Sequence, residues 1–277
     1  MTLTEIRRLL DERGMRPLAR FGQNFLHDQN LARAIVLEAV AELYPAGPVL
    51  EVGPGLGALT ELILEAGLEI TALEIDRGLA AVLRERLGGH PEYGARFHLV
   101  EGDALETLAD PAFRASAGAR PRLFLGNLPY NISTPLLVGV LALPQPPERV
   151  VLTLQKEVAE RLAAKHGTSA YGALTIQIQS GYAVRLVRTL PPSVFYPVPE
   201  VDSAVVRLDR LPSPLIPEGE AAAFHAFVKK GFSQRRKKLS NTLGIADSRR
   251  AEELSVPDWV AAWNAHRPTL PQTDFPS

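Results

Sequence analysis

The sequence contains no cysteine and has only two methionine and two tryptophan residues. The absence of cysteine excludes disulfides and thiolate metal sites. Its histidines never occur at the His-x-x-x-His spacing of a helical zinc site, so we expect no bound metal. No apolar run reaches about 18 residues, and the N-terminus is charged where a signal peptide needs an apolar segment. These absences predict a soluble, cytoplasmic protein with no membrane partner.

Basic residues are concentrated near the C-terminus, although the formal net charge of the chain is only −1. Between Phe224 and Leu243 there are six basic side chains and no acidic one. Solvated helix faces usually mix both signs, so this segment favours contact with RNA phosphates, and a solvated face is the alternative. The candidate RNA-binding residues are Lys229, Lys230, Arg235, Arg236, Lys237 and Lys238.

A glycine-rich turn follows the first predicted strand, Val49 to Val52. Apolar residues at helical spacing begin at Leu59, so this part of the chain indicates a strand, a tight turn and a helix. Glycines leave the turn without side-chain bulk, which lets backbone amides and the helix N-terminus approach a nucleotide-like ligand. The candidate cofactor-binding glycines are Gly53, Gly55 and Gly57.

An acidic residue ends the next predicted strand, Ile70 to Leu73. Glu74 comes about 20 positions after the first glycine, where a carboxylate accepts hydrogen bonds from both hydroxyls of a ribose, and Ile75 follows it. This pattern alone does not name the cofactor, because the glycine spacing also fits a nicotinamide dinucleotide site.

Two further acidic residues at strand ends favour S-adenosylmethionine. Glu51 precedes the first glycine, where it can orient the amino-acid portion of this cofactor, and a solvated strand-end carboxylate is the alternative. Asp103 follows a third strand, Phe97 to Val100, where it can accept from the adenine amine, and an N-cap of the next helix is the alternative. Because strand ends of an open α/β sheet meet in one crevice, the sequence predicts a single site.

The fourth predicted strand, Arg122 to Leu125, leads into the motif Asn127-Leu128-Pro129-Tyr130. The side-chain oxygen of Asn127 and a carbonyl of Leu128 or Pro129 offer two acceptors for the N–H bonds of an exocyclic amine. The Tyr130 ring can stack on the attached base. A strand that simply ends in a proline turn is the alternative. Beside a methyl donor, this motif predicts methylation of a nucleobase amine.

A series of segments along nearly the whole chain resembles the KsgA (RsmA) family of ribosomal RNA adenine dimethyltransferases. The segments are FGQNFLHD, EVGPGLGALT, LEIDRGLA, EGDAL, GNLPYNISTPLL, QKEVAERL, PPSVFYPVPEVDSAVVRL and FSQRRKKLSNTL. The resemblance implies a Rossmann-like class I methyltransferase with a seven-stranded, mostly parallel sheet and a small helical C-terminal domain. It also implies a small-subunit ribosomal RNA substrate.

The resemblance extends to individual residues of the site. It places cofactor contacts at Asn24, Leu26, Gly53, Glu74, Asp103 and Asn127. It also implies that Phe195 approaches the face of the target adenine opposite Tyr130, and a loop aromatic that fills the core is the alternative. Gln23 is adjacent to Asn24 and is a plausible further contact.

The expected organisation has three parts. Residues 1–27 form an N-terminal helix and an arm over the cofactor, residues 28–210 form the methyltransferase domain, and residues 211–277 form a small helical RNA-binding domain. After a fifth strand, Val150 to Leu154, two period-two segments predict that the last two strands pair as an antiparallel hairpin at one sheet edge. The proline-rich segment LPSPLIPEGE marks the boundary to the helical part. Helices are predicted there at roughly 218–231, 235–243, 248–254 and 257–265.

These observations predict an enzyme that dimethylates two adjacent adenosines in a hairpin loop near the 3′ end of 16S ribosomal RNA, as a monomer acting on the small ribosomal subunit. One alternative is an RNA-binding assembly factor with secondary or vestigial methyltransferase activity. Another is a nicotinamide-dependent oxidoreductase on the same class of fold, which would leave the amine pocket without a purpose.

Overall fold

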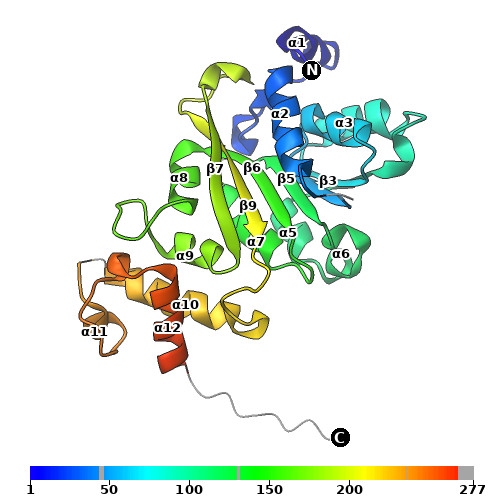
Figure 1. The fold of residues 1–277 in the computed structure, drawn as a ribbon. Helices are drawn as coiled ribbons and strands as arrows, with labels where there is room; N and C mark the ends of the chain where they lie inside the picture. Colours follow the sequence, from blue (N-terminus) through cyan, green and yellow to red (C-terminus); the bar gives the residue numbers. More distant parts are fainter. Residues whose placement is uncertain (44–46, 130–131, 235, 268–277) are drawn as a thin grey trace, which may run out of the picture. The chain divides into compact units, whose positions relative to one another are not determined.

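The computed structural model describes residues 1–43, 47–129, 132–234 and 236–267 (Figure 1). The chain forms two compact units. The first unit consists of Met1–Ala159 and Arg185–Arg210, and the second of Glu160–Val184 and the residues from Leu211 onward.

A seven-stranded sheet is the centre of the first unit, with the spatial order β4-β3-β2-β5-β6-β9-β7. Its strands are β2 (Val49–Val52), β3 (Ile70–Glu74), β4 (Phe97–Glu101), β5 (Leu123–Asn127), β6 (Arg149–Gln155), β7 (Tyr182–Leu190) and β9 (Ser203–Arg210). The pairs from β4 to β6 are parallel, and β9 runs antiparallel to β6. The chain order reverses at β2, so the carboxyl ends of β2, β3 and β5 form the switch point where ligands bind in such sheets.

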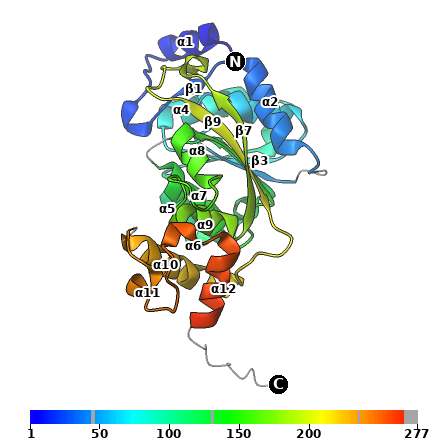
Figure 2. The ribbon, with the colours of Figure 1, turned by 60° about the vertical axis from the view of Figure 1, so that its left-hand side comes forward.

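Helices cover both faces of this sheet, with α2 on one side and α5 and α7 on the other (Figure 2). The helices associated with the sheet are α2 (Gln29–Val40), α3 (Ala58–Glu65), α4 (Arg77–Leu83), α5 (Ala104–Ala109), α6 (Pro111–Ala115), α7 (Ser133–Leu141) and α8 (Lys156–Leu162). Asp28 caps α2 by accepting from the Leu31 amide, and Leu31, Ile35 and Val36 are buried in the core.

The N-terminal segment begins with α1 (Leu3–Glu12), which is closed by a capping box between Thr2 and Glu5. The arm that follows contains the short strand β1 (Phe25–Leu26). This strand pairs antiparallel with β8 (Phe195–Tyr196), and Leu26 lies opposite Phe195. The sequence predicted the arm but not this pairing.

The second unit is built from α9 (Ala173–Gln179), α10 (Ala221–Gly231), α11 (Leu239–Thr242) and α12 (Val256–His266). Its core places Tyr171 and Ile176 with Phe224, Trp259 and Trp263. The chain from Glu160 up to the first residues of β7 therefore belongs to this unit, whereas the sequence boundaries assigned it to the methyltransferase domain. Aromatic packing explains the difference. Tyr171 and Ile176 precede β7 in sequence, but they are buried against the large aromatic rings of α10 and α12, which follow it.

The fold class predicted from the sequence is confirmed. Every predicted strand is present within a few residues, and β7 lies beside β9 at the sheet edge. Two predicted C-terminal helices are wrong. In the first, predicted over 235–243, the described residues form only the single turn α11, and in the second, over 248–254, they form only a turn at Ala251–Glu253. None of the helices within the described ranges is both long and apolar enough to cross a membrane.

Candidate active site

The turn between β2 and α3 contains three glycines whose backbone lies in the left-handed region, with φ of 68° at Gly53, 62° at Gly55 and 86° at Gly57. A Cβ atom on Gly55 would lie 3.1 Å from Cδ1 of Phe25 and 3.2 Å from its Cε1. Glycine is therefore required at position 55 both by the backbone angle and by the close approach of the arm. The sequence predicted the open turn, but not its contact with Phe25.

Two buried carboxyl groups lie at the ends of β2 and β3. Glu51 is 2% exposed and accepts a 2.7 Å hydrogen bond from Thr60 Oγ1. Burial raises the pKa of Glu51 to about 8, and the neighbouring Glu74 carboxyl contributes to this increase. Glu51 is thus a buried acid, and the alternative of a solvated strand-end carboxylate is wrong.

Glu74 is 4% exposed and bonds to the backbone of the turn and of its own strand end. Its carboxylate accepts from the Gly55 amide at 3.1 Å and from the Asp76 amide at 2.9 Å. Burial nevertheless raises the pKa of Glu74 to about 7. A carboxylate has about four lone-pair positions, so it retains acceptor capacity for ligand hydroxyls.

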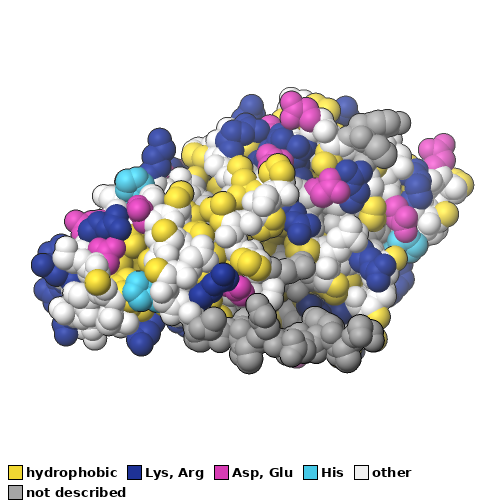
Figure 3. All heavy atoms as spheres, turned by 60° about the horizontal axis from the view of Figure 1, so that its bottom comes forward, with side chains coloured by type: hydrophobic (Ala, Val, Ile, Leu, Met, Phe, Trp, Pro, Cys, Tyr) yellow, Lys and Arg dark blue, Asp and Glu magenta, His cyan; other side chains and the backbone are white. Residues whose placement is uncertain are grey.

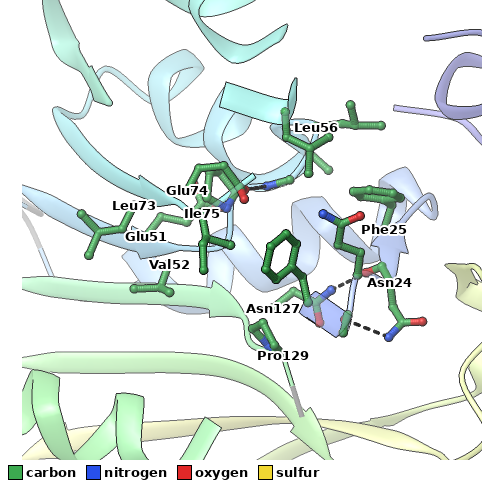
Figure 4. Close-up of a pocket in the computed structure, with 18 of the residues that line it drawn as sticks. Asn24, Phe25, Glu51, Val52, Leu56, Leu73, Glu74, Ile75, Asn127 and Pro129 are labelled. Atoms are coloured by element: carbon green, nitrogen blue, oxygen red, sulfur yellow. Dashed lines mark hydrogen bonds between the residues drawn. The ribbon is translucent and has the colours of Figure 1, made fainter. Parts of the chain in front are cut away.

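The end of β4 contributes Asp103, whose Oδ1 accepts from the Leu105 amide at 2.8 Å and caps α5. Asp103 also lines the cavity. The N-cap and the cofactor contact are therefore compatible, because the carboxylate has a second oxygen. Figure 4 shows side chains from β2, β3, β5 and the arm around one cavity. The predicted site residues that line it are Asn24, Leu26, Glu51, Gly53, Gly55, Glu74, Ile75, Asp103, Asn127 and Pro129.

Asn127 ends β5 and faces the N-terminal arm. Its Nδ2 donates a 2.7 Å hydrogen bond to the backbone carbonyl of Asn24 (Figure 4). Asn24 in turn donates from its own side chain to the Gly22 carbonyl at 3.1 Å. One cavity is thus lined by an amide side chain at the end of β5 and by two buried acids at the ends of β2 and β3. This arrangement can bind a cofactor beside a nucleobase that accepts a methyl group.

Comparison with known proteins agrees with this arrangement. Residues 16–259 match the family model described as "Ribosomal RNA adenine dimethylase". The chain belongs to this family. A relative from Synechococcus sp. (strain JA-3-3Ab) is 42% identical over 267 residues, which cover 88% of this chain and 91% of the relative. One from Magnetococcus marinus is 41% identical over 278 residues, 95% of this chain and 97% of the relative. Both are named "Ribosomal RNA small subunit methyltransferase A".

Solved structures of similar fold include the 23S rRNA methyltransferase ErmE, with a TM-score of 0.65, 27% identity and coverage of 87% of this chain and 98% of that chain. A dimethyladenosine transferase from Plasmodium falciparum has a TM-score of 0.72 at 22% identity, with the same coverage of 87% and 98%, and supports the fold alone. The family resemblance and the fold inferred from the sequence are confirmed. Membership of this family disfavours the alternative of a nicotinamide-dependent oxidoreductase.

Three of the predicted site residues do not line the cavity. Gly57 belongs to the turn but is absent from the cavity lining, and a Cβ atom there would lie 3.1 Å from Cδ2 of Leu83. The Leu128 side chain is 1% exposed, so any role in binding an amine belongs to its backbone carbonyl. Phe195 is 1% exposed and packs in the core cluster with Leu26. This position agrees with the alternative interpretation of Phe195 as an aromatic residue that fills the core. Its stacking on adenine stays a prediction. Tyr130 lies outside the described residues.

The predicted RNA-binding residues lie in the second unit and are exposed where the structure describes them. Lys229 and Lys230 are in the last turn of α10. Arg236, Lys237 and Lys238 follow in the connection to α11, and Arg235 lies outside the described residues. Lys and Arg side chains also project at many points of the face drawn in Figure 3.

Two features of the site were not predicted from the sequence. Phe25 lines the cavity and fits against the glycine turn, and Gln23 bonds to Asp76 at 2.9 Å. Gln23 was considered only as a possible cofactor contact. The only sequence signal for this bond is the position of Gln23 next to the predicted contact Asn24. Local patterns do not indicate Asp76 as its partner, because the two residues are 53 positions apart.

Proposed function

We propose that this protein transfers methyl groups from S-adenosylmethionine to the exocyclic amines of two adjacent adenosines in a hairpin loop near the 3′ end of 16S ribosomal RNA. The observation that carries this proposal is the position of Asn127. Its amide ends β5 in a cavity that also holds the buried acids Glu51 and Glu74. Membership of the ribosomal RNA adenine dimethylase family supports the same reaction.

The residues of the cavity fit S-adenosylmethionine. Glu74 has acceptor capacity for the ribose hydroxyls, Asp103 has an oxygen for the adenine amine, and Asn24 and Leu26 line the cavity from the arm. The buried Glu51 suits the cationic amino-acid portion, because a buried carboxyl with a raised pKa gains most from a positive partner. When bound, S-adenosylmethionine supplies an electrophilic methyl group on a positively charged sulfur.

The protein's own part in the reaction is to orient the acceptor amine. The lone pair of an adenine amine is delocalised into the ring, so the nitrogen is a weak nucleophile. Asn127 Oδ1 and the carbonyl of Leu128 or Pro129 would accept the two amine hydrogens, which favours a pyramidal nitrogen with its lone pair directed at the methyl group. Such positioning contributes about 7–11 kcal/mol. No strong general base is required, because the methylated amine is acidic enough to lose its proton to water.

Dimethylation adds a requirement for the pocket. After the first transfer the amine has only one hydrogen left, and it must rotate to present its lone pair again. Tyr130 is proposed to hold the ring during this rotation, since stacking on one face tolerates rotation of a substituent. A second stack by Phe195 would require its side chain to leave the core cluster in which it is buried. Each stack contributes about 1–3 kcal/mol.

The exposed basic residues of the second unit are proposed to contact the RNA. The set comprises Lys229, Lys230, Arg235, Arg236, Lys237 and Lys238. We also propose that the protein acts as a monomer in the cytoplasm, where its ribosomal substrate is found, because residues of one chain suffice to form the cavity.

The test is methyl transfer from labelled S-adenosylmethionine to small subunits that lack the modification, followed by nucleoside analysis. Wild type is expected to yield dimethyladenosine, and Asn127→Ala is expected to bind the particle without producing it. Binding without transfer by the wild type would overturn the proposal and favour an assembly factor instead.

A further inference from the structure

The amide orientation of Asn127 is set by the N-terminal arm. An amide side chain has a donor end and an acceptor end, whereas a backbone carbonyl only accepts. The 2.7 Å contact between Asn127 Nδ2 and the Asn24 carbonyl therefore fixes which end faces the arm. Oδ1, the acceptor that the reaction needs, is directed away from Asn24. Any displacement of Asn24 removes this constraint.

Gln23 determines where Asn24 lies. Its side-chain Oε1 accepts from the Leu18 amide at 2.7 Å, and its Nε2 donates to Oδ2 of Asp76 at 2.9 Å. The first bond closes the arm on itself, and the second ties it to the start of α4. The side-chain amide of Gln23 is thus used at both ends.

Asp76 is itself held firmly. Its Oδ1 caps α4 by accepting from the Gly78 amide at 2.8 Å and the Leu79 amide at 3.3 Å. Its own amide donates to Oε1 of Glu74 at 2.9 Å. A continuous chain of bonds therefore runs from the Glu74 carboxylate through Asp76 and Gln23 to the arm residue that orients Asn127.

We propose that Gln23 is a positioning residue for methyl transfer, which holds the arm against Asp76 so that the Asn24 carbonyl keeps Oδ1 of Asn127 directed at the acceptor amine. This inference rests on the proposed function of Asn127. It links the carboxylate proposed to bind the cofactor to the group proposed to orient the acceptor, so that the acceptor pocket is set only when the arm is seated.

The polarity of the Gln23–Asp76 bond permits a matched test. In Gln23→Glu two carboxylates oppose each other, and in Asp76→Asn two amino groups do, because Gln23 cannot flip without facing the Leu18 donor. Asn still caps α4. In the double variant the carboxylate introduced at position 23 would accept both from Leu18 and from the amide introduced at position 76, so the bond is restored with reversed polarity. Gly67→Ala, far from the arm in sequence, serves as a control for a general decrease in stability.

Two readouts separate positioning from structure. At saturating cofactor and RNA, each single variant is expected to lower kcat about 10- to 100-fold, the decrease that a displacement of about 1 Å produces, with little change in the KM for RNA. The double variant is expected to recover most of this decrease. Hydrogen exchange of the amides in residues 22–27, measured without RNA, is expected to accelerate in the singles and to recover in the double.

Wild-type kcat in both single variants, or a double variant no better than the poorer single, would overturn the inference. If the amides of residues 22–27 exchange more slowly in the wild type than in the single variants, but the wild type methylates no small subunit, the proposed function is overturned instead. In that case the exchange data would still decide whether Gln23 holds the arm. Equal exchange in all four proteins would show that it does not.

Discussion

The Thr60 hydroxyl on α3 donates a 2.7 Å hydrogen bond to the buried Glu51 carboxyl on β2. Both side chains are almost fully removed from solvent, at 0% and 2% exposure. One hydroxyl does not compensate for burial, since the pKa of Glu51 is raised to about 8. The ligand-free cavity therefore favours a neutral acid at this position, and the carboxylate needs a positive partner.

Glu51→Gln is expected to stabilise the ligand-free protein at alkaline pH. The folded-state pKa lies above the unfolded value, so the folded form holds the extra proton between about pH 4.5 and pH 8. The contribution of Glu51 to the free energy of unfolding is thus fully present below that window and declines by about 1.4 kcal/mol per pH unit as pH rises through it. Glutamine does not titrate, so thermal unfolding should show a Tm difference that grows from acid to alkaline pH.

Glu65→Gln is the control for this measurement, because Glu65 is exposed. It is expected to shift Tm little, with no comparable trend. A Tm difference for Glu51→Gln that stays constant with pH would contradict the prediction.

Cofactor binding is expected to release protons near neutral pH. The pKa of Glu74 is raised to about 7 in the ligand-free protein, chiefly by burial, and ribose hydroxyls would favour its ionised form. Affinity for S-adenosylmethionine should therefore increase as pH rises toward about 8 and then level off. Calorimetry in two buffers of different ionisation enthalpy measures the release directly.

Glu74→Gln is expected to weaken binding about 10- to 100-fold, because a hydrogen bond to a charged group contributes about 1.5–3 kcal/mol. It should also reduce proton release. Unchanged release in this variant would assign the proton to Glu51 instead.

Gly55→Ala and Gly67→Ala form a matched pair. Both glycines have positive φ, 62° and 82°, so alanine costs about 1–2 kcal/mol of backbone strain at either position. Only the Cβ at position 55 meets the Phe25 ring, whereas that at position 67 has no heavy atom within 4 Å among the described neighbours. Both variants are expected to lower Tm, but only Gly55→Ala should weaken cofactor binding in titration calorimetry. Equal affinity in the two variants would sink this prediction.

Features formed within one segment were predictable from the sequence, whereas contacts between distant segments were not. β2 has the predicted bounds because four apolar or buried residues lead directly into a glycine turn. Glu51, Glu74, Asp103 and Asn127 were predictable because each lies at or near the carboxyl end of a strand in a sheet whose strand ends converge. The Gln23–Asp76 bond and the Phe25 contact with Gly55 join the arm to later parts of the chain, and no local periodicity indicates them.

The second unit shows the same limit. Residues 160–184 follow the fifth strand and look continuous with the sheet, yet Tyr171 and Ile176 pack with aromatic residues of α10 and α12. The predicted helix at 235–243 has good local propensity, but the Lys238 backbone forms a bridge with Arg250, and only the single turn α11 follows it.

Lys237→Gln with Lys238→Gln is expected to weaken RNA binding without changing transfer at saturating RNA. Both side chains are exposed, and each phosphate that is no longer neutralised should reduce the slope of log affinity against log salt by roughly 0.7–0.9. Filter binding over a range of salt concentrations measures this slope. Lys165→Gln is the control, because Lys165 is also exposed in the same unit but lies outside the basic segment. A slope that stays at the wild-type value would remove both residues from the proposed RNA-binding set.

Asn127→Asp is expected to invert the pH dependence of methyl transfer. A carboxylate offers only acceptors, so at neutral pH it would repel the Asn24 carbonyl that now accepts from Asn127 Nδ2 at 2.7 Å. Its protonated form has one O–H to donate to Asn24 and one carbonyl oxygen to accept from the amine, which reproduces the arrangement of the amide.

The same cavity raises the pKa of Glu51 to about 8 and that of Glu74 to about 7, and the Asn24 carbonyl favours the protonated form, so the pKa of a carboxyl at position 127 should also be raised. Single-turnover transfer by the Asp variant should therefore increase as pH falls from about 8 to about 6, toward tenfold per pH unit above its pKa. Wild type should change in the opposite sense, as Glu74 loses its proton with rising pH. Asn127→Ala, which has neither donor nor acceptor, should remain inactive throughout. An Asp variant that is equally inactive at both ends of this range would mean that the donor to Asn24 does not govern the reaction.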